Sequence, residues 1–338
     1  MKDAPQVLLS GFADESANRK TAVEQFAAFA ALGLQYYSIR FIDVGSGVKN
    51  VMKLTKEEIQ QVRQWQQEYG LRVSSIGSPI GKVKLQDIDD GTTNVYVPFK
   101  KYLAEDVRHA CQLAHTFETR LIRGFSFYPP KGADPQPYMP QAVDQIGQIA
   151  DLCEKEGLLF GLEVEANLVG QNGYLLAEIY RQLRRHSALV LVFDAANILC
   201  QGYSPAETFE QYQAMKPGIG WIHVKDYRYR PQAVKGGHVD EEALRHFVPV
   251  HLGDSGYDRI LRDFAPSIPA LERKLKRRGV PGVFLELEPH LKGGGQFGGF
   301  SGPDGMGVAL RSLCRVLDYL GIQYHLRDFD DIRAARGF

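Results

Sequence analysis

The stretch Ala188–Asp226 reads ALVLVFDAANILCQGYSPAETFEQYQAMKPGIGWIHVKD and predicts the fold of the chain. It opens on the apolar run ALVLVF and closes on a second apolar run, GIGWIHV. Between the two runs the spacing predicts a helix near Pro205–Met215. A strand, a helix and a second strand in this order indicate a right-handed crossover between two parallel strands.

The same unit recurs along the whole chain. The expected strands are Gln6–Phe12, Tyr36–Arg40, Leu71–Gly77, Thr119–Phe125, Leu158–Glu165, Ala188–Asn197, Gly218–Asp226 and Gly282–His290. Eight strand-then-helix units fit a closed (β/α)8 TIM barrel better than an open doubly wound sheet. No GxGxxG motif follows the first strand, which disfavours a dinucleotide-binding fold. No stretch resembles a linker, so we predict one α/β domain over residues 1–338, with a core of about 7–320 and a C-terminal extension, 321–338.

Two connections are longer than an ordinary loop of a compact barrel. They are Gly77–Val95, after strand three, and Tyr227–Asp254, after strand seven. Long loops at such positions usually serve as lids or binding loops. The glycine-dense stretch Lys292–Gly305 is expected at the rim.

Composition excludes several classes of partner. The 338 residues hold 40 Lys+Arg and 40 Asp+Glu, so no global charge attracts nucleic acid or an anionic membrane. No stretch approaches the roughly 18 apolar residues of a membrane span, and the N-terminus lacks the features of a signal peptide. The four cysteines lack CxxC pairing, and we expect reduced thiols and a cytoplasmic location.

The chemistry of such a barrel is expected at the carboxyl ends of its strands. The polar residues there are Glu163 and Glu165 on strand five, Asp194 and Asn197 on strand six, His223, Lys225 and Asp226 on strand seven, and Glu286, Glu288 and His290 on strand eight. Taken singly, Glu163 is a candidate rim residue, Asp194 a helix cap and His223 a core histidine. Their equivalent places in successive units favour a shared divalent-metal site of the kind that suits Mn²⁺, Mg²⁺, Co²⁺ or Zn²⁺.

Spacing alone does not choose between the two acids on each strand. Glu163 and Glu165 are two residues apart, as are Glu286 and Glu288, so both members of a pair can face inward. Lys225 lies two residues beyond His223 and is expected either to hold substrate oxygens or to pair with a nearby acid.

The strand-end motifs GLEVEANLVGQNG, FDAANI, IHVKD and LELEPH resemble those of the xylose isomerase-like TIM barrel superfamily, the sugar phosphate isomerase/epimerase family. The resemblance runs from about Val7 to Leu320. It implies one divalent metal, with Mn²⁺ preferred, on Glu163, Asp194, His223 and Glu288. The family patterns place the ligand first in the strand-five pair and directly before proline in the strand-eight pair. Glu286 is then expected to be buried beside a basic partner.

The resemblance implies a metal-dependent isomerase or epimerase of a keto sugar or related polyol, working through an enediolate. Glu163 and Glu288 are the implied catalytic acid/base pair as well as metal ligands. The candidates for substrate binding are Lys225, Asn197, His290, Arg123, His251 and Glu165. Asn197 departs from the best-known ketose 3-epimerases, which carry histidine there, and no phosphate-binding loop is evident.

Other functions remain open at this point. A lyase or dehydratase acting on an inosose or a 3-keto-glycoside shares the first proton abstraction. An apurinic-site endonuclease is disfavoured by the zero net charge and the scattered histidines. A non-catalytic sugar-binding barrel is expected to lack a ligand, and none of the four is missing. The expected partner is a small carbohydrate; the C-terminal tail is expected either to be a solvated extension or to pack on a second copy of the chain.

Overall fold

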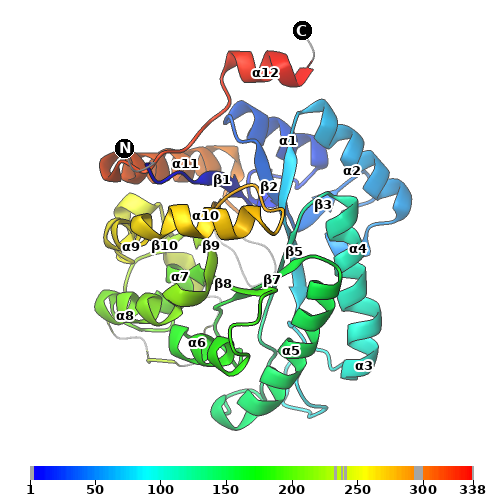
Figure 1. Ribbon diagram of the computed structural model, residues 1–338, viewed down its shortest axis with the longest axis vertical. Helices are drawn as coiled ribbons and strands as arrows, with labels where there is room; N and C mark the ends of the chain where they lie inside the picture. Colours follow the sequence, from blue (N-terminus) through cyan, green and yellow to red (C-terminus); the bar gives the residue numbers. More distant parts are fainter. Residues whose placement is uncertain (1–3, 232–233, 237–238, 240–241, 293–299, 337–338) are drawn as a thin grey trace.

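Eight parallel strands form the centre of the computed structural model (Figure 1), which describes residues 4–231, 234–236, 239, 242–292 and 300–336. The strands are β1 (Leu8–Gly11), β2 (Tyr36–Ile39), β5 (Arg72–Ile80), β6 (Leu121–Gly124), β7 (Leu159–Glu163), β8 (Leu189–Asp194), β9 (Ile219–Val224) and β12 (Phe284–Leu287). Their hydrogen-bonded order is β1-β12-β9-β8-β7-β6-β5-β2. A parallel bridge between Phe12 and Ser38 brings β1 back to β2. The predicted (β/α)8 barrel is confirmed.

Helices surround this barrel (Figure 1). They are α1 (Ala22–Ala31), α2 (Lys56–Glu68), α3 (Phe99–Tyr102), α4 (Arg108–Thr116), α5 (Met139–Lys155), α6 (Gly173–Gln182), α7 (Ala195–Leu199), α8 (Pro205–Met215), α9 (Tyr257–Phe264), α10 (Ile268–Lys276), α11 (Gly302–Leu320) and α12 (Phe329–Arg336). Reciprocal capping boxes, Thr55 with Glu58 and Ser204 with Glu207, start α2 and α8. No described helix has the length and apolar character that a membrane crossing requires.

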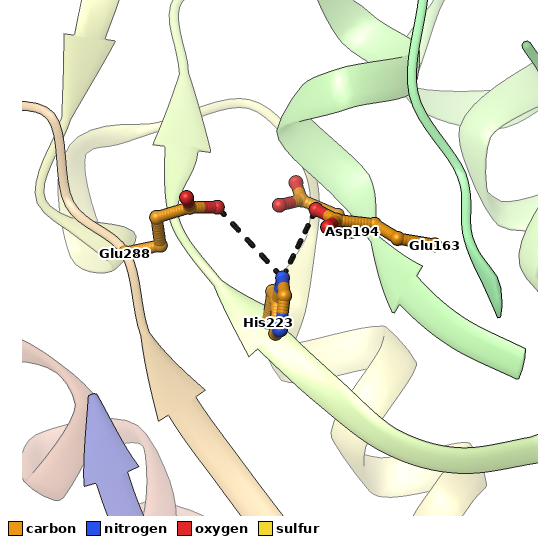
Figure 2. A group of neighbouring side chains, drawn as sticks. All are labelled: Glu163, Asp194, His223 and Glu288. Carbon is orange, nitrogen blue, oxygen red and sulfur yellow. Dashed lines mark hydrogen bonds and ion pairs between the residues drawn. The ribbon is translucent and has the colours of Figure 1, made fainter. Parts of the chain in front are cut away.

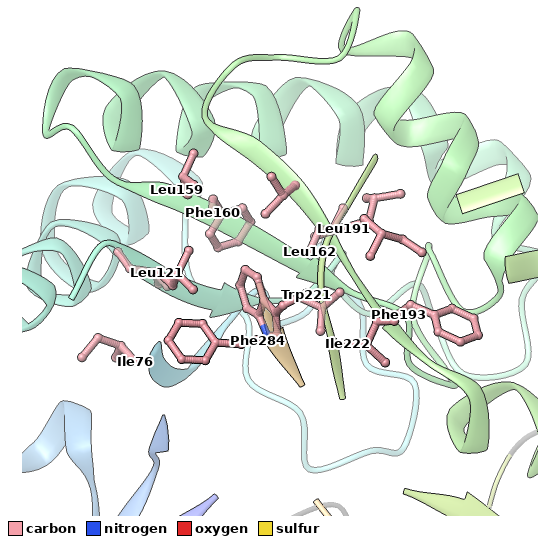
Figure 3. Close-up of a cluster of buried hydrophobic side chains, with 14 of the residues drawn as sticks. Ile76, Leu121, Leu159, Phe160, Leu162, Leu191, Phe193, Trp221, Ile222 and Phe284 are labelled. Atoms are coloured by element: carbon pink, nitrogen blue, oxygen red, sulfur yellow. The ribbon is translucent and has the colours of Figure 1, made fainter. Parts of the chain in front are cut away.

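Buried hydrophobic side chains pack inside the barrel and between its strands and the surrounding helices (Figure 3). Trp221 on β9 is buried, and a Cβ added to Gly161 on β7 would lie 1.9 Å from its ring. The strand therefore needs glycine at this point, because any side chain would collide with the indole. Such packing makes the interior a solid core and leaves the strand ends to carry polar groups.

Some connections differ from the sequence predictions. β5 continues to Ile80, past the predicted end at Gly77, although Pro79 favours a turn; Ile80 pairs with Gly124 beyond a register shift. A hairpin of β3 (Phe41–Asp43) and β4 (Val48–Asn50) was not predicted. The long connection after β9 contains the antiparallel pair β10 (Asp226–Tyr227) and β11 (Phe247–Val248). Part of that connection, and residues 293–299 of the glycine-dense stretch, lie outside the described residues.

The C-terminal extension runs over the outside of the barrel. Gln323 bridges to Gln6, and Arg327 donates hydrogen bonds of 3.0 and 3.1 Å to the carbonyls of Tyr69 and Gly70 at the end of α2. Beyond these contacts α12 stands away from the helical ring (Figure 1). The four cysteines are unpaired thiols; three are buried, and Cys314 is partly buried.

Candidate metal centre and active site

Glu163, Asp194, His223 and Glu288 converge at the carboxyl end of the barrel (Figure 2). Glu163 and Asp194 are the last residues of β7 and β8, His223 lies near the end of β9, and Glu288 directly follows β12. All four are buried, and one potential ligand atom from each lies within 4.8 Å of the others. Three carboxylates and one imidazole nitrogen form a donor set suited to a divalent cation.

The imidazole of His223 lies between carboxylates on both of its nitrogens. Its Nδ1 lies 3.0 Å from Glu163 Oε1 and 3.7 Å from Glu288 Oε2 (Figure 2), whereas its Nε2 lies 3.1 Å from Glu286 Oε2. Burial alone would lower the pKa of His223, but the negative charges of Glu163 and Glu286 outweigh it and raise the pKa to about 10. Without a metal the imidazole is therefore a cation that donates from both nitrogens.

Glu286 is the deeper of the two acids on β12. Its Oε1 accepts hydrogen bonds of 2.6 Å from Ser74 Oγ and 3.2 Å from Ser10 Oγ, and its Oε2 faces His223. The expected basic partner is thus a metal-ligand candidate rather than a lysine or arginine. A carboxylate on the far nitrogen of a ligating histidine fixes the ring and its tautomer, so Glu286 is placed to orient His223 toward a metal.

The two carboxylate oxygens of Asp194 have different partners. Its Oδ1 accepts a 3.1 Å hydrogen bond from the backbone N–H of Asn197 and so caps α7. Its buried Oδ2 makes no hydrogen bond to the described residues and stands 3.1 Å from Lys225 Nζ. Burial raises the pKa of Asp194 to about 6, against the opposing charge of Lys225. Among the described residues, an ion at Oδ2 would share this oxygen with Lys225 alone.

Cations crowd Glu288. Arg40 Nη1 lies 2.6 Å and Arg123 Nη1 3.8 Å from its Oε1, while Lys225 Nζ lies 3.0 Å from its Oε2. Burial opposes ionisation, yet Lys225, His290 and Arg40 hold the pKa of Glu288 well below its usual range. At Glu163 burial likewise opposes ionisation, but the positive charges of His223 and Arg123 outweigh it and lower the pKa to about 2. Both carboxylates are therefore charged at neutral pH.

The N-terminal segment supplies three charged residues that sequence reasoning missed. Asp14 and Glu15 lie just after β1, and Arg40 follows β2. Arg40 contacts both acids, at 3.2 and 3.4 Å, and Glu15 Oε1 lies 2.6 Å from His290 Nδ1. The signal was available in the sequence, because these residues also follow predicted strands.

The remaining predicted residues divide into two groups. Asn197 joins the cluster by donating to Glu163 Oε1 at 3.3 Å, and His290 approaches it with Nε2 4.0 Å from Glu288 Oε1. Glu165 instead turns to Lys82, 2.7 Å away. His251 is exposed and bonds to Ser312 of α11 at 2.7 Å; no contact joins it to the four-residue cluster among the described residues.

Comparison with known proteins agrees with this architecture. The family model described as xylose isomerase-like TIM barrel matches residues 26–315. No curated protein matches the sequence significantly.

Solved structures of similar fold include a magnesium-bound protein, an epimerase and a probable dehydratase. A xylose isomerase-like TIM barrel protein from Mycobacterium smegmatis in complex with magnesium is 17% identical, with a TM-score of 0.60 over 94% of this chain and 97% of that one. D-allulose 3-epimerase from Methylomonas sp. is 14% identical (TM-score 0.58, 94% and 100% covered). The probable 3-DHS dehydratase AsbF from Bacillus anthracis is 15% identical (TM-score 0.55, 91% and 98% covered). At these identities the likeness establishes the fold alone.

Proposed function

Because this chain belongs to the xylose isomerase-like TIM barrel family, we propose that it is a divalent-metal-dependent isomerase or epimerase of a keto sugar or related polyol. One observation carries the proposal: four buried ligand candidates from four successive strands of the barrel present their donor atoms within 4.8 Å of one another. Mn²⁺ is the proposed ion, with Mg²⁺, Co²⁺ and Zn²⁺ as alternatives. The unpaired thiols support a reducing, cytoplasmic location.

Glu163, Asp194, His223 and Glu288 would hold the metal, which supplies Lewis-acid stabilisation of negative charge on a substrate oxygen. Glu163 and Glu288 approach the cluster from opposite sides (Figure 2). We assign them the acid/base pair: one carboxylate removes the proton next to the carbonyl, and the other takes up a proton from solvent and delivers it to the carbon skeleton. Asn197 donates a hydrogen bond of 3.3 Å to Glu163, and Arg40 donates one of 2.6 Å to Glu288.

The second candidate is a lyase or dehydratase acting on an inosose or a 3-keto-glycoside. One residue favours it, because Asn197 occupies the position at which the resemblance to ketose 3-epimerases calls for histidine. The side-chain amide of Asn197 also donates to the carbonyl of Val164 at 3.0 Å, so this side chain is held in place. The same carbanion would then expel a leaving group at the β-position.

The test is a panel of keto sugars and keto-glycosides in D₂O, with full-length protein stripped of metal and reloaded with Mn²⁺. Solvent deuterium entering the recovered sugar, followed by NMR, supports isomerisation or epimerisation. An unsaturated product or a released aglycone supports the lyase. If no substrate exchanges or reacts with any of the four metals, the enzymatic proposal fails and a sugar-binding role takes its place.

A further inference from the structure

Two buried arginines near Glu288 differ in how well they are paired. Both guanidinium groups lie over the ring of Phe12, at 4.2 Å for Arg40 and 4.8 Å for Arg123. Arg40 reaches both oxygens of Asp14, with Nε at 3.3 Å and Nη2 at 3.2 Å, and Glu288 at 2.6 Å. This pattern is that of an arginine fixed by its own protein.

Arg123 lacks such pairing. Only 5% of the residue is exposed, yet its hydrogen bonds are long: 3.4 Å to Glu163 and 3.5 Å to the Gly77 carbonyl. Its Nε has no hydrogen-bond partner among the described residues. Charge-assisted N–H···O bonds are usually about 2.7–2.9 Å, and a buried polar group left without one is costly. The guanidinium also lies over the rings of Phe12 and Phe125, each 4.8 Å away.

The acids that face Arg123 and Lys225 are all assigned to the metal. Arg123 contacts Glu163 and Glu288, and Lys225 contacts Glu288 and Asp194. A bound divalent cation takes up much of the negative charge of its ligands, so both cations lose attraction in the loaded protein. Arg40 keeps Asp14 and Glu15 in that state. Two buried cations, on β6 and just beyond β9, would then border the site without full partners.

Resting on the proposed function, we propose that the substrate carries a carboxylate, and that Arg123, aided by Lys225, binds it. The substrate class is a keto sugar acid or a related keto-hydroxy acid. A planar guanidinium fork matches a carboxylate with two parallel hydrogen bonds. We assign a carboxylate rather than a phosphate, because no segment of the sequence matches the GxxxxGK[ST] phosphate loop.

The experiment compares matched substrates on the Mn²⁺-loaded full chain: D-fructose and D-tagatose, their 6-carboxylate forms and their 6-phosphates. Deuterium exchange from D₂O is measured as kcat and KM. We expect kcat/KM for the acids to exceed that for the neutral sugars at least 100-fold. In Arg123→Gln the preference should fall at least tenfold through a higher KM, and Arg123→Lys should restore part of it. Arg120→Gln, on the same chain segment at the opposite end of the barrel, is the matched control. Bound Mn²⁺ is measured in every variant.

The outcomes separate the two proposals. Exchange with neutral sugars at least as fast as with the acids overturns the carboxylate site and leaves the isomerase standing. Preference for the 6-phosphates overturns the carboxylate assignment as well. Lack of exchange in all six compounds refutes the isomerase; the carboxylate site then stands only if the acids, and not the neutral sugars, raise the melting temperature in an Arg123-dependent way. An unchanged preference in Arg123→Gln with full metal content also overturns the inference.

Discussion

The ends of β7 and β12 carry the same pattern of two acids separated by one residue, yet the structure uses the two pairs differently. At β7 the first acid, Glu163, joins the candidate metal cluster, and Glu165 leaves it for Lys82. At β12 the second acid, Glu288, joins the cluster, and Glu286 lies deeper beneath His223. Identical spacing therefore gives opposite assignments.

Strand tilt explains the difference. Register partners lead from Glu163 to Val192 on β8 and then to Trp221 on β9. The next residue, Ile222, pairs with Leu285 on β12, which precedes both acids of that strand. In a tilted barrel residues at equal height do not share a register, and the matching position moves along by about one residue per strand. Asp194 accordingly lies two residues beyond Val192, the register partner of Glu163, and Glu288 lies two residues beyond Glu286, the register partner of His223.

The largest expected effect on metal affinity comes from replacing single acids of the two pairs by glutamine. Glu163→Gln and Glu288→Gln each remove a ligand, so Mn²⁺ affinity measured by calorimetry should fall at least about 1,000-fold. Glu165→Gln, the matched control two residues from Glu163, should leave the affinity within about twofold. Full binding by Glu163→Gln together with its loss in Glu165→Gln would reverse the β7 assignment.

The pH dependence of the metal-free protein tests whether Glu163 and Glu286 together stabilise the protonated imidazole of His223. Because contact with Glu163 and Glu286 raises its folded pKa from 6.5 to about 10, folding retains a proton that the unfolded chain releases. Its contribution to the free energy of unfolding is complete below about pH 6.5 and is lost as pH rises toward 10. A tenfold difference in proton affinity between the folded and unfolded chains corresponds to about 1.4 kcal/mol.

Chemical denaturation in EDTA between pH 6 and 10 measures this loss, and His223→Asn is the control that should flatten it. A wild-type stability that stays constant across the window would contradict the charged, doubly donating imidazole.

The sequence predicts the barrel well, because eight short, largely apolar segments alternate with segments of helical spacing. It also places Glu163, Asp194, His223 and Glu288 at strand ends. It does not predict the network around them. Neither the pairing of His223 with Glu286 nor that of Glu165 with Lys82 follows from local spacing, since both depend on how strands distant in sequence stagger in the closed barrel. His251 illustrates the same limit, because this histidine of a long loop contacts Ser312 on α11 and not the four-residue cluster.

Glu286→Gln should have an intermediate effect. Glutamine still accepts from Ser74 but no longer carries the charge that orients the His223 ring, so we expect metal affinity to fall about 10–100-fold. Ser74→Ala, which leaves the carboxylate in place, should cost less. Calorimetry gives the affinities, and ¹⁵N NMR of His223 in the loaded protein reports its tautomer. Wild-type affinity with an unchanged tautomer in Glu286→Gln would remove the orienting role.

The smallest effect is expected at the acid that the cluster leaves out. Glu165 and Lys82 pair at 2.7 Å with side chains 17% and 15% exposed, and Lys82 also lies 4.3 Å from the centre of the Phe125 ring. A partly exposed ion pair usually contributes no more than about 1 kcal/mol. A double-mutant cycle with Glu165→Gln and Lys82→Met, read by chemical denaturation, should therefore give a coupling free energy below about 1 kcal/mol, with Mn²⁺ affinity unchanged in each variant. A coupling of several kcal/mol that changes when metal is added would instead join Glu165 electrostatically to the four-ligand cluster, and the contrast between the two strand ends would no longer hold.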